Sequence, residues 1–332
     1  MKIAFFEIKK WEEEHVKKKL KGHKLYFFRY PLNLKNIDKA EQADIIVSFI
    51  YSELNAKLLS KLNKLRFIAT MSTGFDHIDF EFCKKNNIKI SNVPYYGENT
   101  VAEHTFALIL ALSKKIHNAI EKTKREDFSL SGLIGFDLKG KTLGVIGAGH
   151  IGQHVIKIAR GFDMNVISYS VHQDKNLSRK LGFKWVSSIN KLLKESDIVT
   201  IHVPLNESTK HMINMKSIKN FKRGAYLINT ARGEIVDNAA LLYGLDNGIL
   251  AGAGLDVLEG ECDIKEEKEF LHNEKKCDWR DVIEAHLLLK EKNVIVTPHC
   301  AFYTQEALMR ILDTTLDNIN GFLKGRAINN VV

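Results

Sequence analysis

Residues 142–152 read Thr-Leu-Gly-Val-Ile-Gly-Ala-Gly-His-Ile-Gly, so an apolar segment of strand type runs directly into Gly147, Gly149 and Gly152. Apolar residues at helical spacing follow at once, across residues 155–159. In such a strand–turn–helix, the first glycine permits a tight turn and the second lets the backbone approach a pyrophosphate. The third glycine allows the helix to pack closely on the strand, with its N-terminal amides facing the phosphates. The segment therefore predicts a dinucleotide-binding turn.

Short apolar segments alternate with charged, helix-compatible ones on both sides of this turn. Long helices are expected from Asn99 or Thr100, where Thr100 and Glu103 form a capping-box pattern, and from about Thr304 to Leu323. Alternation of this kind predicts parallel sheets covered by helices, and 332 residues suit two domains rather than one core. The expected strands are Ile3–Glu7, Leu25–Tyr30, Asp44–Ile50, Phe67–Met71, Ile88–Val93, Thr142–Ile146, Asn165–Ser170, Asp197–Val203, Ala225–Asn229, Gly252–Val257 and Val294–Thr297.

Charge and hydropathy exclude several classes of protein. The net charge is +9, but basic residues are mixed with acidic ones, as where Lys17–Lys19 follow Glu12–Glu14, and no nucleic-acid motif is present. The longest apolar run in a helical pattern, Phe106–Leu112, is far shorter than the ~20 residues of a membrane span. Charged residues interrupt the only early apolar run, which argues against a signal peptide. We expect a soluble protein that binds neither nucleic acid nor membrane.

The four cysteines, Cys83, Cys262, Cys277 and Cys300, lack the close spacing of metal ligands. Reduced thiols in a cytoplasm are the simplest interpretation. A zinc site built from Cys262, Cys277 and a nearby histidine is a less favoured alternative, and we expect no metal.

The end of the second strand of a dinucleotide fold usually carries an acid that binds the ribose of NAD. Ser170 stands there, 18 residues after Gly152, and lacks the carboxylate that would repel a 2′-phosphate. His172 and Lys175 could meet such a phosphate, but no arginine follows Ser170 directly. We therefore expect NAD as the cofactor, with NADP as the alternative.

Polar or turn segments follow the later expected strands: His202-Val-Pro204, Asn229-Thr-Ala-Arg-Gly233, Asp256-Val-Leu-Glu-Gly-Glu261 and Thr297-Pro-His299. Ligands bind at the carboxyl ends of the strands in an open parallel sheet. Singly, Arg232 could be a surface ion-pair partner, Glu261 a solvated acid and His299 a structural histidine. Together, at successive strand ends of a dinucleotide fold, they indicate a catalytic site.

Over essentially the whole chain, these segments resemble the D-isomer-specific 2-hydroxyacid dehydrogenases, and within them the D-lactate dehydrogenase branch. The likeness rests on residues 72–79, 92–96, 101–104, 128–136, the glycine turn and residues 293–304. The sequence departs from the family pattern in two places. Ser170 replaces the aspartate that selects NAD, and the segment between Glu261 and His299 is several residues longer than expected.

The resemblance implies specific site residues. Arg232, Glu261 and His299 would be the catalytic trio. Thr73 and Gly74 would offer amides to the substrate carboxylate, with pocket walls from Tyr96, Phe302 and Tyr303 and further substrate contacts from Arg232 and His299. The cofactor would lie against Gly147, Gly149, His150, Ile151, Gly152, Ser170, Val203, Pro204, Thr209, Thr230, Ala231, Arg232 and Asp256.

The resemblance also implies an architecture of two Rossmann-like or flavodoxin-like parallel-sheet α/β domains with a cleft between them. Residues 1–100 and 299–332 would form a discontinuous substrate-binding domain, and residues 101–298 the NAD(P)-binding Rossmann domain. The family further implies a homodimer formed through the long helix from Thr100. The charged segment 262–292 is interpreted as a surface excursion with some helix rather than as a lid.

The expected activity is reversible hydride transfer between a nicotinamide and a small anionic 2-oxo or 2-hydroxy acid, with pyruvate and D-lactate as the best match. His299 would donate the proton as an imidazolium, because imidazoles titrate near neutral pH. Glu261 would orient its ring, and the planar fork of Arg232 would bind the carboxylate and polarise the carbonyl. The alternatives are a hydroxypyruvate or glyoxylate reductase, an oxidoreductase acting on another small acid, or a non-catalytic NAD-sensing protein similar to transcriptional corepressors.

Overall fold

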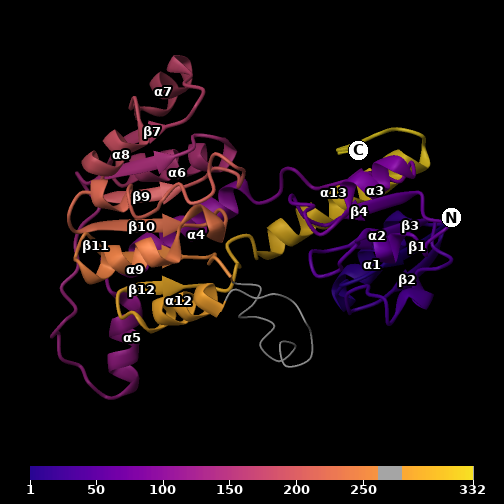
Figure 1. Ribbon diagram of the computed structural model, residues 1–332, viewed down its shortest axis with the longest axis horizontal. Helices are drawn as coiled ribbons and strands as arrows, with labels where there is room; N and C mark the ends of the chain where they lie inside the picture. The colour runs from indigo at the N-terminus through magenta and orange to yellow at the C-terminus, as the bar shows by residue number, and fades with distance from the viewer. Residues whose placement is uncertain (261–278, 332) are drawn as a thin grey trace. The chain divides into compact units, whose positions relative to one another are not determined.

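The computed structural model describes residues 1–260 and 279–331 and divides the chain into two compact units (Figure 1). Unit 1 comprises Met1–Gly97 and Thr304–Val332, and unit 2 comprises Glu98–Tyr303. The chain thus passes from one unit to the other after Gly97 and again after Tyr303, whereas the sequence-based domain boundaries fall after residue 100 and before residue 299.

Unit 1 contains a five-stranded parallel sheet in the order β2-β1-β3-β4-β5. Its elements are β1 (Lys2–Phe5), α1 (Lys10–Lys19), β2 (Lys24–Phe27), the 3-10 helix η1 (Ile37–Lys39), β3 (Ile45–Ser48), α2 (Ala56–Leu59), β4 (Phe67–Thr70), α3 (Phe80–Lys85), β5 (Lys89–Ser91) and α13 (Gln305–Leu323). Every residue of β3 and β4 is buried, as expected for strands that are covered on both faces.

Helix α13 completes the core of unit 1 from the far end of the sequence. It packs on β4 and α1, and its residues Ile311, Leu316 and Ile319 are buried. The rings of Phe67 on β4 and Phe322 on α13 stack with centroids 4.4 Å apart. The N-terminal residues and the C-terminal helix therefore form one folding unit.

Unit 2 contains a seven-stranded parallel sheet in the order β12-β11-β10-β9-β6-β7-β8. Its elements are α4 (Glu98–Ser113), α5 (Ile116–Lys124), β6 (Thr142–Ile146), α6 (His150–Gly161), β7 (Asn165–Tyr169), α7 (Lys175–Leu181), β8 (Lys184–Trp185), α8 (Ile189–Glu195), β9 (Ile198–Ile201), η2 (Ile218–Asn220), β10 (Ala225–Asn229), η3 (Gly233–Ile235), α9 (Asn238–Asp246), β11 (Leu250–Leu255), α12 (Trp279–Lys290) and β12 (Val294–Val296).

The strands of unit 2 send alternate side chains into two cores, as the two-residue repeat of a strand requires. On β6, Leu143 and Val145 belong to a core cluster that includes residues of α4 and α6, whereas Ile146 belongs to a second cluster that includes residues of α8, α9 and α12. Helices therefore cover both faces of this sheet (Figure 1). The polar residues that follow the strands are left at the carboxyl edge of the sheet.

Most elements agree with the sequence-based expectations, although several strand ends differ by one to three residues; two further differences among the described residues concern α4 and β8. Helix α4 begins at Glu98, so Thr100 lies inside its first turn and is buried rather than capping it, and the side chain of Asn99 donates to Glu103 instead. The two-residue strand β8 was not expected. Of the charged segment 262–292, residues 279–290 form α12, and residues 261–278 lie outside the described part of the chain.

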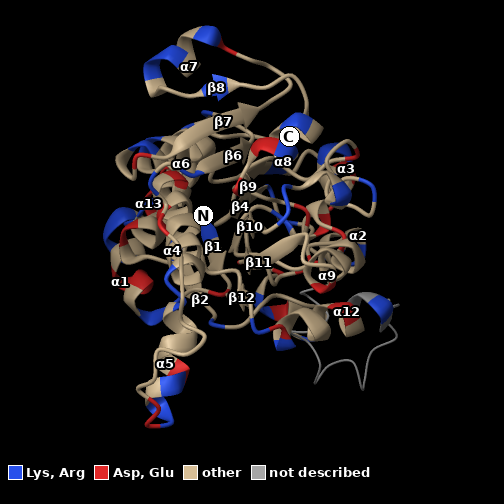
Figure 2. Cartoon of the chain, turned by 90° about the vertical axis from the view of Figure 1, so that its left-hand side faces the viewer, with Lys and Arg blue, Asp and Glu red and all other residues tan. Residues whose placement is uncertain are grey.

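Basic and acidic residues are interspersed along helices such as α1 and α5, as the charge pattern predicts (Figure 2). Within the described residues, every helix is too short or too polar to cross a lipid bilayer.

Candidate active site

The glycine turn lies between β6 and α6, and its geometry explains each glycine. Gly147 has φ of 95°, a left-handed conformation that favours glycine, and a Cβ there would lie 2.5 Å from the carbonyl oxygen of His202. A Cβ at Gly152 would lie 2.0 Å from the carbonyl oxygen of Gly147. No heavy atom lies within 4 Å of a Cβ built at Gly149, which is exposed. The turn is thus tight at its first and third glycines and open at its second, as a pyrophosphate site requires.

Replacing Gly152 by alanine is expected to lower the free energy of unfolding by about 1–3 kcal/mol, because the new methyl group overlaps backbone that cannot move aside freely. The matched variant Gly149→Ala has open space for its methyl group and should unfold near the parent midpoint, while its affinity for NAD falls. Thermal unfolding and NAD titration of both variants test this. Equal loss of stability in the two variants would contradict it.

The hydroxyl of Ser170, after β7, accepts a hydrogen bond of 3.0 Å from the backbone N–H of Ala148 in the glycine turn. Ser170 therefore ties the end of the second strand to the turn and is half-buried there. His172 and Lys175, the candidate phosphate ligands, are exposed. His150 is also exposed at the start of α6, with Nδ1 3.3 Å from a carboxylate oxygen of Glu98, and Ile151 is half-buried behind it.

The candidate residues between β9 and β11 lie after strand ends, but several side chains are bonded within the protein. The hydroxyl of Thr209 is buried and donates to the carbonyl of Pro204, which fixes the loop after β9 beside Val203. The hydroxyl of Thr230 is 3.1 Å from that of Thr105 on α4 and is buried. These two threonines can meet a cofactor chiefly through their backbone.

Arg232 is exposed and follows β10, so its guanidinium is at the carboxyl edge of the sheet. Asn229 shapes this loop, because its side chain accepts from the N–H of Ala231 and donates to the carbonyl of Arg232. A Cβ at Gly233 would lie 2.2 Å from the carbonyl of Leu258. The Arg232 loop is therefore in direct contact with the chain after β11. That chain leads to Glu261, which lies outside the described residues.

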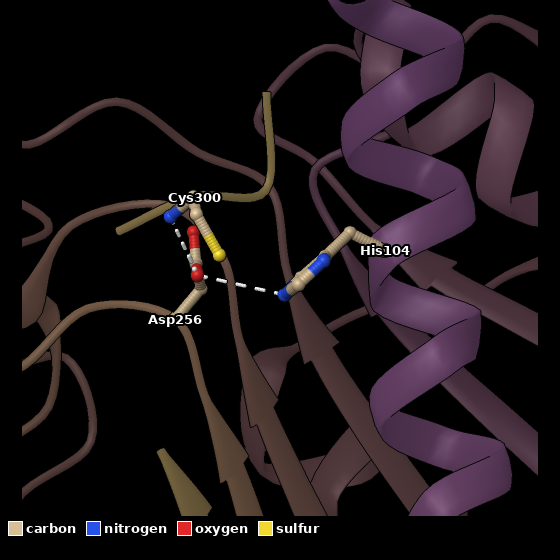
Figure 3. Close-up of side chains that lie close together, drawn as sticks. All are labelled: His104, Asp256 and Cys300. Atoms are coloured by element: carbon tan, nitrogen blue, oxygen red, sulfur yellow. Dashed lines mark hydrogen bonds and ion pairs between the residues drawn. The ribbon is translucent and has the colours of Figure 1, made fainter. Parts of the chain in front are cut away.

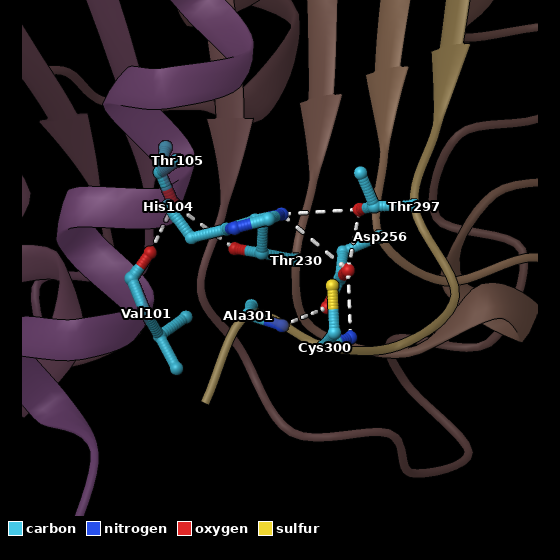
Figure 4. Close-up of polar contacts among 8 residues, drawn as sticks. All are labelled: Val101, His104, Thr105, Thr230, Asp256, Thr297, Cys300 and Ala301. Atoms are coloured by element: carbon cyan, nitrogen blue, oxygen red, sulfur yellow. Dashed lines mark hydrogen bonds and ion pairs between the residues drawn. The ribbon is translucent and has the colours of Figure 1, made fainter. Parts of the chain in front are cut away.

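His299 follows β12 and has φ of 51°, which is uncommon for a residue other than glycine. Its N–H donates to the backbone carbonyls of Asp256 and Thr297, both at 2.9 Å. The Asp256 carboxylate accepts the N–H groups of Cys300 and Ala301 and the hydroxyl of Thr297 (Figure 4). Asp256 thus holds the turn that carries His299, a role the sequence did not indicate. Its side chain is only 1% exposed.

His104 on α4 and Cys300 join this cluster, and the sequence assigned a role to neither. His104 Nε2 is 3.5 Å from Asp256 Oδ1 (Figure 3) and 3.0 Å from Thr297 Oγ1 (Figure 4). The residues 104, 256 and 300 are far apart in the chain, so no local pattern could have brought them together. A second unpredicted contact joins His211 to Glu259, with Nε2 and Oε1 2.6 Å apart, and braces the chain after β11.

Two other titratable groups near this edge are poorly suited to acid–base chemistry. Burial lowers the pKa of His202 to about 3, and its ring lies 2.8 Å from the hydroxyl of Thr200. Burial, followed by the charge of Asp256, raises the pKa of the Cys300 thiol. His202 is therefore neutral and Cys300 a thiol near neutral pH, so neither is a candidate proton donor.

The candidate substrate residues of unit 1 follow β4 and β5. The hydroxyl of Thr73 donates to the carbonyl of Val93, and Asn92 donates to the carbonyl of Thr73, so the two loops brace each other. Gly74 accepts from Ser72. The carbonyl of Tyr96 accepts a hydrogen bond of 2.6 Å from Arg310 on α13. In unit 2, Phe302 and Tyr303 lie after His299 with their rings edge to face, 5.8 Å between centroids.

A half-buried carboxylate in unit 1 was also not identified by the sequence analysis. Glu7, after β1, has φ of 61° and accepts hydrogen bonds from the N–H groups of Phe49 and Tyr51 and the hydroxyl of Ser52. Burial raises the pKa of Glu7 despite these bonds. The contact joins β1 to β3, the place where the strand order of this sheet reverses.

Comparison with known proteins places these features in a family. Residues 106–301 match the model of the D-isomer specific 2-hydroxyacid dehydrogenase, NAD binding domain. The chain is 31% identical to a D-lactate dehydrogenase of Escherichia coli, over 99% of each chain. It is 38% identical to an aromatic 2-oxoacid reductase of Clostridium sporogenes, over 83% of this chain and 82% of that one. The structure of D-lactate dehydrogenase from Aquifex aeolicus complexed with NAD and lactic acid superimposes with a TM-score of 0.85 at 37% identity, covering 97% of this chain and 96% of that one.

Proposed function

Because the chain belongs to the D-isomer-specific 2-hydroxyacid dehydrogenases, we propose that its preferred reaction is the reduction of pyruvate to D-lactate. The reaction class follows from the family: an NAD-dependent oxidoreductase that acts on the CH–OH group of a 2-hydroxy acid. Pyruvate as the substrate is supported by the relatives named D-lactate dehydrogenase. An aromatic 2-oxo acid is the second candidate, because the aromatic 2-oxoacid reductase is also a close relative.

The main support for the proposal is that Arg232, His299 and the glycine turn lie at the same edge of one sheet. All three follow strands of the same parallel sheet, at its carboxyl edge. The open space at Gly149 and the left-handed Gly147 fit a bound dinucleotide. An exposed guanidinium and a half-buried imidazole at the same sheet edge as the glycine turn favour catalysis over NAD sensing alone.

The chemistry then follows from the charge that develops during reduction. NAD, when bound, supplies or accepts the hydride at the substrate carbon. Arg232 binds the substrate carboxylate with its planar fork and polarises the carbonyl. His299, as an imidazolium, donates its proton to the carbonyl oxygen as negative charge grows there, and Glu261 orients the ring. In the reverse direction His299 accepts the proton of the hydroxyl group.

The remaining contacts are proposals for the same complex. Thr73 and Gly74 would bind the substrate carboxylate, and Tyr96, Phe302 and Tyr303 would surround its side chain. The cofactor would meet His150, Ile151, Val203, Pro204, Thr209, Thr230, Ala231 and Asp256 besides the glycines. Residues 1–100 with 299–332 would bind substrate, and residues 101–298 the cofactor.

Steady-state rates with pyruvate, phenylpyruvate, hydroxypyruvate and glyoxylate, each with NADH and NADPH, test the proposal. Pyruvate with NADH should give the highest kcat/KM. The product should be oxidised by an enzyme that is specific for D-lactate. A higher kcat/KM for phenylpyruvate would favour the aromatic 2-oxo acid instead. The absence of turnover with all four acids would refute both.

We propose that the enzyme prefers NAD over NADP only weakly, because Ser170 carries no charge that would repel the 2′-phosphate. The variant Ser170→Asp should lower kcat/KM with NADPH by about 10–100-fold, because its carboxylate repels the 2′-phosphate, while keeping an acceptor for the N–H of Ala148. The rate with NADH should hold or rise. Ser170→Ala is the matched control, since it removes the acceptor without adding charge. A parallel fall with both cofactors in Ser170→Asp would contradict this prediction.

We also propose a homodimer. The apolar residues of α4 are mostly buried within unit 2, but the segment after it exposes large apolar side chains. Phe128, Leu130 and Ile134 are 79%, 81% and 88% exposed, and Ile116 and Ile120 on α5 are about half-exposed. Large apolar side chains that are exposed close together in the sequence support an interface with another protein chain here. Sedimentation should show a dimer that Phe128→Ser with Ile134→Ser weakens; a monomeric parent would refute it.

A cytoplasmic location is proposed on the state of the described cysteines. Cys83 and Cys300 are free thiols, as is usual in a reducing compartment.

A further inference from the structure

His104 and Cys300, which take no part in the proposed reaction, flank Asp256 at the carboxyl edge of unit 2 (Figure 3). One imidazole nitrogen, one carboxylate oxygen and one sulfur, from these three residues, all lie within 4.8 Å of one another. The residues come from α4, the chain after β11 and the chain after β12. The fold of unit 2 therefore holds three different donor atoms close together without any local sequence motif.

Among the described residues, no lysine or arginine forms an ion pair with the carboxylate of Asp256. The Asp256 side chain is 1% exposed, and among the described residues its only ion-pair partner is His104, at 3.5 Å. Its other partners are neutral: two backbone N–H groups, the hydroxyl of Thr297 and the thiol of Cys300 (Figure 4). A buried carboxylate that has only neutral donors and a titratable imidazole around it favours the entry of positive charge.

The donor types select a class of cation. Imidazole nitrogen, thiolate sulfur and carboxylate oxygen are the ligands of zinc and of cadmium-like soft cations, whereas magnesium and calcium prefer oxygen alone. Three protein ligands leave a fourth position for water. Thr297 Oγ1 contacts the same nitrogen of His104, Nε2, at 3.0 Å, and would give up that contact when a cation binds.

From this arrangement we infer that His104, Asp256 and Cys300 form a binding site for a thiophilic divalent cation such as Zn²⁺. On binding, the Cys300 thiol releases its proton to solvent and its sulfur bonds the cation, with no change of oxidation state. The cation also binds a carboxylate oxygen of Asp256, and this carboxylate holds the turn that carries His299. Zn²⁺ should therefore inhibit turnover, a consequence that rests on the proposed function.

The binding test uses the full chain with Cys262 and Cys277 both changed to serine, so that neither thiol contributes. Isothermal titration with Zn²⁺ should show one bound equivalent in this background, and Cd²⁺ should give the ultraviolet charge-transfer band of a cadmium–thiolate bond. In the same background Cys300→Ser and His104→Gln should each weaken Zn²⁺ at least about 10–100-fold, and Cys300→Ser should abolish the band. Unchanged affinity in either variant, or no uptake by the background protein, would overturn the site.

The inhibition test keeps the two proposals separable. Zn²⁺ should lower turnover of the background protein, a chelator should restore it, and Cys300→Ser should resist the cation. Binding without inhibition would overturn the regulatory consequence. A protein that binds Zn²⁺ with the expected variant pattern but reduces no 2-oxo acid would refute the proposed function and leave the cation site supported.

Discussion

Replacing His299 by glutamine is expected to lower kcat by about 10²–10⁴-fold while leaving the affinity for NADH close to that of the parent. Glutamine keeps a hydrogen-bonding group of similar reach but cannot donate a proton to the developing alkoxide. The backbone contacts of residue 299, to the carbonyls of Asp256 and Thr297, do not depend on its side chain. Steady-state kinetics with pyruvate and a fluorescence titration of NADH measure the two effects separately.

His172→Gln is the matched control for this variant, because His172 is exposed on the same unit and has no role in proton transfer. It should reduce pyruvate at the parent rate with NADH. Turnover of His299→Gln within a factor of a few of the parent would remove His299 from the mechanism. A large loss of NADH affinity instead would indicate that the turn had collapsed.

Arg232→Lys is expected to reduce kcat/KM for pyruvate by about 10–100-fold, with a rise in KM as well as a fall in kcat. Lysine keeps the charge but replaces a planar, two-pronged donor by a point charge, so it cannot hold a carboxylate in one orientation. The exposed side chain and the loop fixed by Asn229 indicate that the variant should fold normally. Substrate kinetics together with an unfolding curve check both parts.

Arg223→Lys provides the comparison, since Arg223 is an exposed arginine of the same unit outside the candidate site. Its kinetics should match those of the parent. Unchanged pyruvate kinetics in Arg232→Lys would show that the guanidinium does not contact the substrate carboxylate.

The strands were predictable because parallel strands covered on both faces are short apolar runs. Ala225–Asn229 and Thr142–Ile146 have the expected bounds, and the glycine turn between β6 and α6 has the conformation its sequence indicates. Strand β8 was missed because two residues carry no periodicity. The capping-box prediction at Thr100 was wrong because a cap is worth only about 1 kcal/mol, and the chain enters α4 two residues earlier.

A residue of the candidate site could be predicted from the sequence only where it directly follows a recognisable strand. Arg232 and His299 follow strands that are recognisable one by one, and the sheet brings them to one edge. The bonds that Asp256 makes to residues 297, 300 and 301, and its contact with His104, join segments far apart in sequence. Such contacts depend on packing in three dimensions, which a single sequence does not report.

The way unit 1 is assembled from both ends of the chain has a consequence for synthesis on the ribosome. Unit 2 is one continuous segment, whereas the sheet of unit 1 is completed by α13, which can pack on β4 only after all of unit 2 has been translated. Until then, α13 cannot bury the apolar residues of β4 on which it packs, such as Phe67. A nascent chain therefore exposes an unfinished core of unit 1 while unit 2 is being synthesised, and ribosome-associated chaperones that shield apolar surface should bind it during that interval.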